Sequence, residues 1–170
     1  MSNMIPIQTV TVGSSGASRI DFTNIPQNYT DLRLVISGRQ NAGSGFGYST
    51  LSFNNDATTT NTTFRNMVTE GSSTVATYNQ GAYGTGGEIN AAGLPGATST
   101  FGHMEVYIPN YSSYNIKPYS INSATPNLYW WWQGSHLYNS TRPITAIKYT
   151  NINYNLTQHT TATLYGIRKY

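Results

Sequence analysis

The sequence predicts an all-β fold, specifically an antiparallel β-sandwich of the jelly-roll type. Apolar and polar residues alternate along many short segments, and no sustained 3.6-residue apolar stripe marks an amphipathic helix. Turn residues separate these segments at intervals of about 8 to 12 residues, a spacing that two packed antiparallel sheets produce. With 170 residues, the chain is expected to form a single domain over residues 1–170.

The first two strands are expected near the N-terminus. Apolar residues alternate from Ile5 to Val12, and a Gly-Ser-Ser-Gly sequence at 13–16 follows them. Glycine reaches positive φ without steric cost, so this sequence predicts a tight turn. A short strand over Arg19–Phe22 comes next.

The clearest alternation falls on two later segments. Asp31–Arg39 places its leucines and one isoleucine on the same face, and Phe101–Ile108 alternates in the same way until Pro109 ends it. These segments are predicted to supply much of the core. The predicted core residues are Leu32, Leu34, Ile36, Val106, Ile108, Leu164 and Ile167.

Seven further strands complete the prediction, at residues 48–53, 62–69, 74–78, 116–123, 128–136, 144–153 and 160–170. Between them, the segment at about 79–99 contains six glycines and Pro95 and follows neither the strand nor the helix period. It is predicted to be a long Gly-rich loop. Loops of this length in compact domains are usually either mobile or functional, so it is equally a flexible loop or a candidate partner contact.

The composition narrows the classes of partner. Only 9% of residues are charged and the net charge is +3, with the nine Lys and Arg residues scattered along the chain. A surface that follows phosphates needs clustered basic residues, so no nucleic-acid partner is expected. No apolar run approaches the ~20 residues of a membrane span, and no signal peptide is visible, so we expect synthesis in the cytoplasm and no membrane partner.

Catalytic and metal-binding motifs are missing from the sequence. There is no cysteine, and the six acids and three histidines fall into no recognised catalytic, nucleotide or metal pattern. His103 and Glu105 would share a strand face, which we interpret as a structural pair rather than an acid–base pair. The sequence therefore predicts a protein without enzymatic activity or cofactor.

The densest feature is an aromatic run, Tyr129, Trp130, Trp131 and Trp132. On a strand, Trp130 and Trp132 would point one way and Tyr129 and Trp131 the other, so we expect at least one pair to be buried. Such a cluster can anchor the core or a subunit interface, and exposed aromatic rings also stack on sugars. The four residues are therefore candidate interface or glycan contacts, with packing favoured.

Several stretches resemble small virion proteins of tailed bacteriophages. They are IPIQTVTVG at 5–13, IDFTNIP at 20–26, YTDL at 29–32, YIPNY at 107–111 and ATLYGI at 162–167. The resemblance implies a β-rich structural component of the virion, which is a capsid decoration (cement), head-fibre or tail-associated subunit, and it names no catalytic residue. It also implies association with itself, with a trimer favoured, and with the major capsid protein or other virion proteins.

Two functional hypotheses therefore remain. The first is a decoration or head-fibre subunit located on the outside of the virion. The alternative is a tail-associated or carbohydrate-binding module that adsorbs to a host-surface glycan. A decoration subunit needs broad contacts with neighbouring proteins, whereas a glycan-binding module needs an exposed aromatic shelf with nearby hydrogen-bonding side chains.

Overall fold

The fold was analysed in a computed structural model, which describes residues 3–41, 47–56, 61–69, 76–80, 88–91, 100–125, 130–151 and 154–168. Over these residues the protein is an antiparallel β-sandwich without helix, as the sequence predicts. Accordingly, no described segment is a helix long and apolar enough to cross a membrane.

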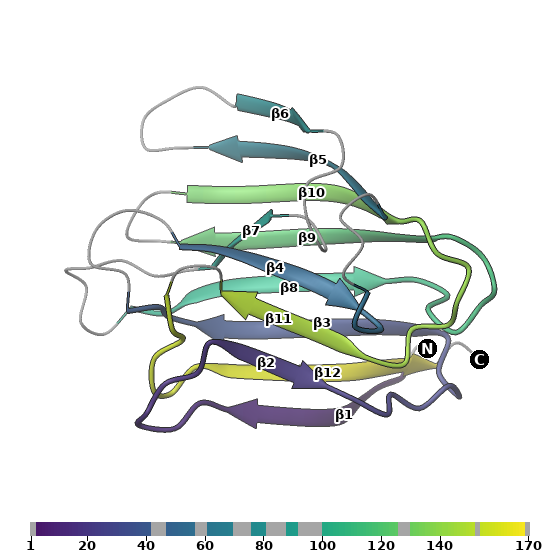
Figure 1. Cartoon of the computed structure of the whole chain (residues 1–170), viewed down its shortest axis with the longest axis horizontal. Helices are drawn as coiled ribbons and strands as arrows, with labels where there is room; N and C mark the ends of the chain where they lie inside the picture. Colours follow the sequence, from purple (N-terminus) through teal and green to yellow (C-terminus); the bar gives the residue numbers. More distant parts are fainter. Residues whose placement is uncertain are drawn as a thin grey trace.

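Two sheets make up the sandwich (Figure 1). The large sheet contains, in spatial order, β1 (Asn3–Thr11), β12 (Thr161–Arg168), β3 (Asp31–Gly38), β8 (Gly102–Ile108), β9 (Lys117–Thr125), β10 (Trp130–Tyr138), β5 (Thr62–Thr69) and β6 (Ala76–Gln80). The small sheet contains β2 (Arg19–Phe22), β11 (Ile147–Asn151), β4 (Gly47–Phe53) and β7 (Glu88–Ala91).

Eight of these strands follow the order of a jelly roll. When β5, β6, β9 and β10 are set aside, the large sheet runs first, eighth, third, sixth and the small sheet runs second, seventh, fourth, fifth. This double Greek key is the jelly-roll arrangement that the sequence analysis expected. We call these eight strands the jelly-roll half.

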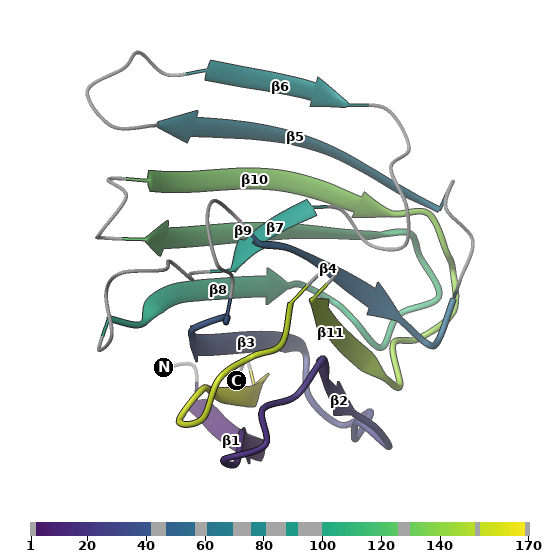
Figure 2. The ribbon, with the colours of Figure 1, turned by 60° about the vertical axis from the view of Figure 1, so that its left-hand side comes forward.

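The other four strands enlarge the large sheet. They are two antiparallel pairs, β5 with β6 and β9 with β10, and they join the sheet beyond β8 in the order β9-β10-β5-β6. We call these four strands the extension. Both views show the small sheet lying across the jelly-roll strands, whereas β10, β5 and β6 continue past it (Figures 1 and 2).

The core lies between the sheets. Six of the seven predicted core residues are buried, with Leu32, Leu34, Val106, Ile108 and Leu164 at 0% exposure and Ile36 at 2%. Their partners across the sandwich are inward side chains of the small sheet, including Ile20, Phe22, Leu51, Phe53, Ile147 and Tyr149. The two sheets therefore share one hydrophobic core.

One core prediction is wrong. Ile167 is half-buried and lies on the opposite face of β12 from Leu164. Residues three apart on a strand face opposite sides, so both side chains could not point inward. Ile167 instead pairs with Met4 of β1 on the side of the large sheet that faces away from the small sheet.

The loop predicted at about 79–99 is also partly wrong. Asn79 and Gln80 complete β6, and Glu88–Ala91 form β7, which pairs with β4 at the edge of the small sheet. This strand was not predicted because it depends on pairing with β4, while the glycines around it favour a loop. The rest of the predicted loop, residues 81–87 and 92–99, lies outside the described residues. By contrast, the predicted turn at 13–16 is confirmed, since the Gly16 N–H donates to the Gly13 carbonyl at 3.1 Å and Gly16 has φ +71°.

Candidate functional site

The aromatic run is divided between the two faces of β10. Trp132 points inward and is 7% exposed, whereas Trp131 points outward and is half-exposed. This is the alternation that the sequence predicts for a strand. Trp130 begins β10, but its side chain and the whole of Tyr129 lie outside the described residues.

Trp131 presents an anchored indole ring on the outside of the large sheet. Its Nε1–H donates to the Asn122 Oδ1 of neighbouring β9 at 3.0 Å, and both side chains remain accessible. Gln133 is the register partner of Asn122 and is also exposed. A fixed ring beside exposed amides can pack on another protein or stack on a sugar.

Trp131 belongs to a much wider surface, which we call the outer face. It consists of the side chains of the large sheet that point away from the small sheet, and every described member is exposed or half-buried except Asp31. Besides Trp131, it includes Met4, Arg33, Val35, Arg65, Met67, His103, Glu105, Tyr107, Ser120, Asn122, Gln133, Ser135, Thr163, Tyr165 and Ile167.

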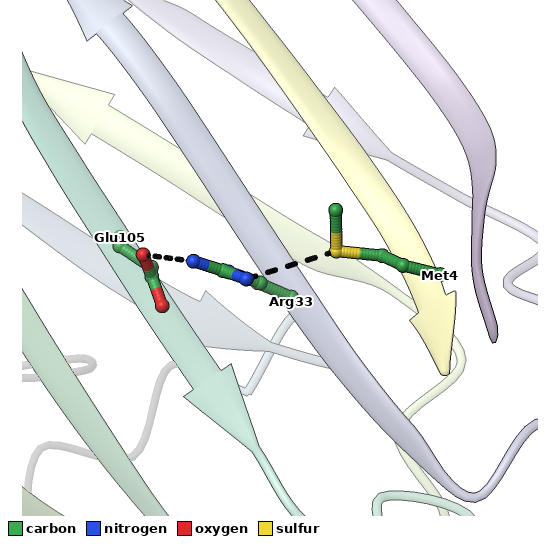
Figure 3. Close-up of polar contacts among 3 residues, drawn as sticks. All are labelled: Met4, Arg33 and Glu105. Carbon is green, nitrogen blue, oxygen red and sulfur yellow. Dashed lines mark hydrogen bonds and ion pairs between the residues drawn. The ribbon is translucent and has the colours of Figure 1, made fainter. Parts of the chain in front are cut away.

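An ion pair lies across the jelly-roll part of the outer face. Arg33 Nη2 of β3 donates to Glu105 Oε2 of β8 at 2.6 Å, and Arg33 Nη1 points at the Met4 sulfur 3.8 Å away (Figure 3). Register places Tyr165 and Tyr107 on either side of Arg33. The guanidinium is therefore neutralised within the face and flanked by aromatic side chains, so this part of the surface adds little net charge.

One carboxylate of the outer face is already engaged in hydrogen bonds within the protein. Asp31 is buried, and it accepts hydrogen bonds from the Tyr107 hydroxyl at 2.7 Å and the Asn110 N–H at 3.0 Å. Burial and the hydrogen bond to Asp31 raise the pKa of Tyr107 to about 12. Tyr107 therefore remains a neutral hydrogen-bond donor. The Asp31–Tyr107 pair holds the first residue of β3 in place and does not serve as a catalytic acid or base.

The predicted His103–Glu105 pair is replaced by another. Both residues do point outward from β8, but Glu105 bonds to Arg33, and His103 is exposed. Arg33 lies on the adjacent strand, diagonal to Glu105, whose register partner is Val35, and its long side chain reaches the carboxylate. Within the described residues, no three His, Asp or Glu side chains gather to hold a metal ion.

The extension also contains a buried polar cluster that the sequence analysis did not identify. Asn66 of β5 and His136 of β10 are 2% and 3% exposed and point inward, and neither side chain has a hydrogen-bond partner within the part of the chain that the structure describes. A Cβ placed on Gly134 would lie 2.2 Å from Asn66 Oδ1 and 2.4 Å from His136 Nε2. The bare backbone of Gly134 is therefore what makes room for these two side chains.

His136 occupies an aromatic stack. Its ring lies between Phe64 of β5, at a centroid distance of 5.4 Å, and Tyr119 of β9, at 4.8 Å, and both pairs are stacked. Burial lowers the pKa of His136 to about 4. The imidazole is consequently neutral near pH 7, and the cluster provides hydrogen-bonding groups without charge.

Only cross-strand register could have revealed this cluster. Asn66, Gly134 and Ile121 lie opposite one another, as do Phe64, His136 and Tyr119 in the adjacent row. Each residue alone resembles ordinary strand composition; the one local signal was a glycine inside a strand, which often marks a close approach.

In comparisons with known proteins, the chain matches no protein-family model and no curated protein.

Proposed function

We propose that this chain is a non-enzymatic structural protein on the outside of a bacteriophage particle, where it acts as a capsid decoration (cement) or head-fibre subunit. The observation that carries the proposal is the outer face. It spans the large sheet, no described segment covers it, and it displays aromatic, thioether and amide side chains such as Trp131, Met67 and Gln133. Continuous surfaces of this kind are typical of protein contacts.

The charge distribution supports close packing against protein. On the outer face Arg33 is paired with Glu105, which leaves Arg65 as its one arginine without an ion pair among the described residues. Interfaces of specific complexes are depleted in charged residues at their centre. An association through such a surface should depend only weakly on salt.

The fold is compatible with the proposal but does not decide it. Jelly rolls build viral capsid proteins as well as lectins, and a fold alone assigns no function. The stretches that resemble phage virion proteins, notably 5–13 and 162–167, correspond to β1 and β12, which pair at the edge of the jelly-roll half. The resemblance supplies the virion class, and the outer face supplies a surface suited to contacts with other proteins.

A cement role requires many weak contacts rather than one strong site. Standard interfaces bury about 1,200–2,000 Å², and repetition over a symmetric shell multiplies their effect by avidity. We also propose that the protein forms a trimer, in which each copy offers the same surface to the major capsid protein.

Copy number and position on purified particles test the proposal. Particles whose genome encodes the chain would be washed at low and high salt and then examined by quantitative mass spectrometry and electron cryo-microscopy. Hundreds of copies spread over the shell at both salt concentrations would support decoration. Complete loss on washing would overturn the proposal.

A second function is favoured by Trp131. Its half-exposed ring, held by Asn122 next to exposed Gln133, has the composition of a sugar-binding platform. In that case the chain would be a tail-associated adsorption module that recognises a host-surface glycan. A few copies at the tail tip, together with loss of adsorption in Trp131→Ala, would select this function over decoration.

A further inference from the structure

A polar hollow lies at the end of the extension away from Trp131. It has a volume of about 410 Å³, which falls in the ~300–1,000 Å³ range of small-ligand sites. Its walls come from three segments: the turn after β4, the residue before β5 and the segment that starts at the end of β10. Trp131 lies at the start of β10 and Tyr138 at its end, roughly 20 Å apart along the strand.

One wall of the hollow is fixed by Asn54. Its Oδ1 accepts from the N–H groups of Thr145 and Ala146 at 2.8 and 3.2 Å, and its Nδ2 donates to the Pro143 carbonyl at 2.9 Å. Asn54 and Asn55 both have positive φ, 54° and 55°, a conformation that Asn tolerates better than most residues. The turn therefore directs the next side chains into a defined position.

Asp56 lines the hollow and its carboxylate is held by hydrogen bonds. Asp56 Oδ2 accepts from Asn61 Nδ2 at 2.7 Å and from the Tyr138 hydroxyl at 3.2 Å. Burial raises the pKa of Tyr138, so its phenol stays protonated and keeps donating. The Asp56 carboxylate is thus held in place by two neutral donors.

The rim carries two uncommitted side chains. Asn55 and Arg142 are exposed and line the hollow, and neither side chain has a hydrogen-bond or ion-pair partner among the described residues. The chain beneath Arg142 is ordered, because its N–H donates to Ser140 Oγ at 3.3 Å and the buried Lys117 Nζ donates to the Ser140 carbonyl at 3.4 Å. An exposed guanidinium without an ion-pair partner among the described residues therefore lines the same hollow as the Asp56 acceptor, on a supported segment.

We propose that this hollow is a binding site for an acidic saccharide. Every described side chain that lines the hollow carries a polar group, which disfavours an apolar ligand. Asp56 is the one carboxylate among these described lining residues, too few for a typical calcium site. Asp56 would accept sugar hydroxyls, and the amides of Asn55 and Asn61 can both donate and accept. Arg142 would form a paired hydrogen bond with the carboxylate of the saccharide, since its fork matches that group.

Titration followed by ¹H–¹⁵N NMR tests the site. The full chain would be titrated with the methyl glycosides of glucuronic acid, galacturonic acid and sialic acid, and with methyl glucoside and methyl galactoside as neutral counterparts. We expect saturable shifts at the amides of 54–56, 61 and 138–142 with at least one acidic glycoside, and binding at least tenfold weaker for its neutral counterpart.

Three variants assign the contacts. Arg142→Ala should weaken acidic-glycoside binding by about tenfold or more, and Arg142→Lys should restore part of it. Asn55→Gly removes the amide while keeping a residue that accepts positive φ, and should weaken binding severalfold. Arg65→Ala, which removes an exposed arginine from the outer face, is the matched control and should bind like the wild type.

Several results would overturn the proposal. One is the absence of saturable shifts with every acidic glycoside while the melting temperature shows a folded chain. Another is equal loss of binding in Arg142→Ala and Arg65→Ala, which would indicate non-specific charge attraction. Shifts confined to the amides around Trp131 would move sugar binding to the outer face.

Discussion

The jelly-roll half and the extension differ in how their buried polar side chains are hydrogen-bonded. In the jelly-roll half, buried Asp31 accepts two hydrogen bonds and the Tyr111 hydroxyl donates to the Pro26 carbonyl. In the extension, buried Asn66 and His136 have no partner among the described residues for any side-chain nitrogen or oxygen. The jelly-roll half also leaves single atoms unpaired there, Arg33 Nε and Asn151 Nδ2, but each of these side chains makes another hydrogen bond. An unpaired buried group costs about 1–3 kcal/mol, so the two fully unpaired side chains of the extension are expected to cost more stability.

This difference indicates that one part of the molecule provides stability and the other provides binding surfaces. The jelly-roll half has two sheets around most of the hydrophobic core, which also takes in Tyr119, Ile121 and Tyr138 of the extension, and it can provide the stable scaffold. The extension continues past the small sheet with β5 and β6, while Tyr119 of β9 and Tyr138 of β10 pack against Phe53 of β4 (Figures 1 and 2). It contributes Trp131 to the outer face and has the polar hollow at its other end. Elements that bind partners commonly come from the less stable parts of a protein. We therefore expect core substitutions to affect folding and extension substitutions to affect binding.

The largest effect is expected in the jelly-roll core. Leu34→Ala removes a fully buried side chain from the middle of β3 and should lower the free energy of unfolding by about 2–5 kcal/mol. Leu137→Ala, on the outer face of the extension and only half-buried, is the matched control and should cost less than about 1 kcal/mol. Denaturant unfolding measures both, and equal losses would erase the distinction between core and outer face.

Acid should act on the extension through His136. Its pKa of about 4 lies below the ordinary value of 6.5, so the unfolded chain takes up this proton first as the pH falls. The free energy of unfolding should therefore drop between about pH 6.5 and 4, by about 3 kcal/mol in total. Above about pH 6.5, His136 should cause no such loss of stability.

His136→Phe isolates this contribution. Phenylalanine fits between Phe64 and Tyr119 and cannot be protonated, so the difference from the wild type should grow as the pH falls from 6.5 to 4. The same substitution at the exposed His103 should leave the acid dependence in place. Parallel pH profiles for wild type and His136→Phe would show that the imidazole is not buried in the folded state.

Two strand glycines allow a direct comparison of the halves. A Cβ at Gly166 in the jelly-roll half would lie 2.4 Å from the Tyr29 ring, and one at Gly134 in the extension would lie 2.2 Å from Asn66. Each Gly→Ala change should cost about 1–3 kcal/mol from overpacking. Gly13→Ala, where nothing lies within 4 Å, should be near neutral in thermal melting.

A second substitution distinguishes the two sites further. Adding Asn66→Ala to Gly134→Ala should recover part of the loss, because it removes both the clash and an unpaired amide. Additive losses in that double variant would mean that Gly134 and Asn66 do not meet.

The smallest effect is expected at the ion pair on the outer face. Glu105→Gln removes the charge opposite Arg33, and because both side chains are partly exposed the cost should stay below about 1 kcal/mol and shrink at high salt. Melting temperatures at low and high salt measure it. A loss of several kcal/mol that is insensitive to salt would indicate a pair sealed from water.

Local alternation predicts most strands but not their assembly. Arg19–Phe22 and Thr62–Thr69 have the predicted bounds, because each lies between clear turn signals. Strand order depends on long-range pairing, such as β1 with β12, which no local pattern encodes. β7 was missed for the same reason: its existence depends on pairing with β4 rather than on its own composition.

The candidate sites follow the same rule. The opposite orientations of Trp131 and Trp132 follow from strand alternation alone. The hollow could not be predicted, because Asp56, Asn61 and Arg142 meet only after three separate segments are folded together. The partner of Glu105 likewise comes from a strand 72 residues away in sequence.

The central claim is that the outer face of the large sheet is the surface that binds the particle. Co-sedimentation of purified protein with particles lacking it tests this claim when one charge is added to either side of the sandwich. Ser135→Arg adds the charge to the exposed outer face of the extension, and Ser52→Arg adds it to the outward side of the small sheet. We predict at least tenfold lower occupancy for Ser135→Arg and wild-type occupancy for Ser52→Arg. Unchanged binding of Ser135→Arg, or loss of binding in Ser52→Arg alone, would contradict the account.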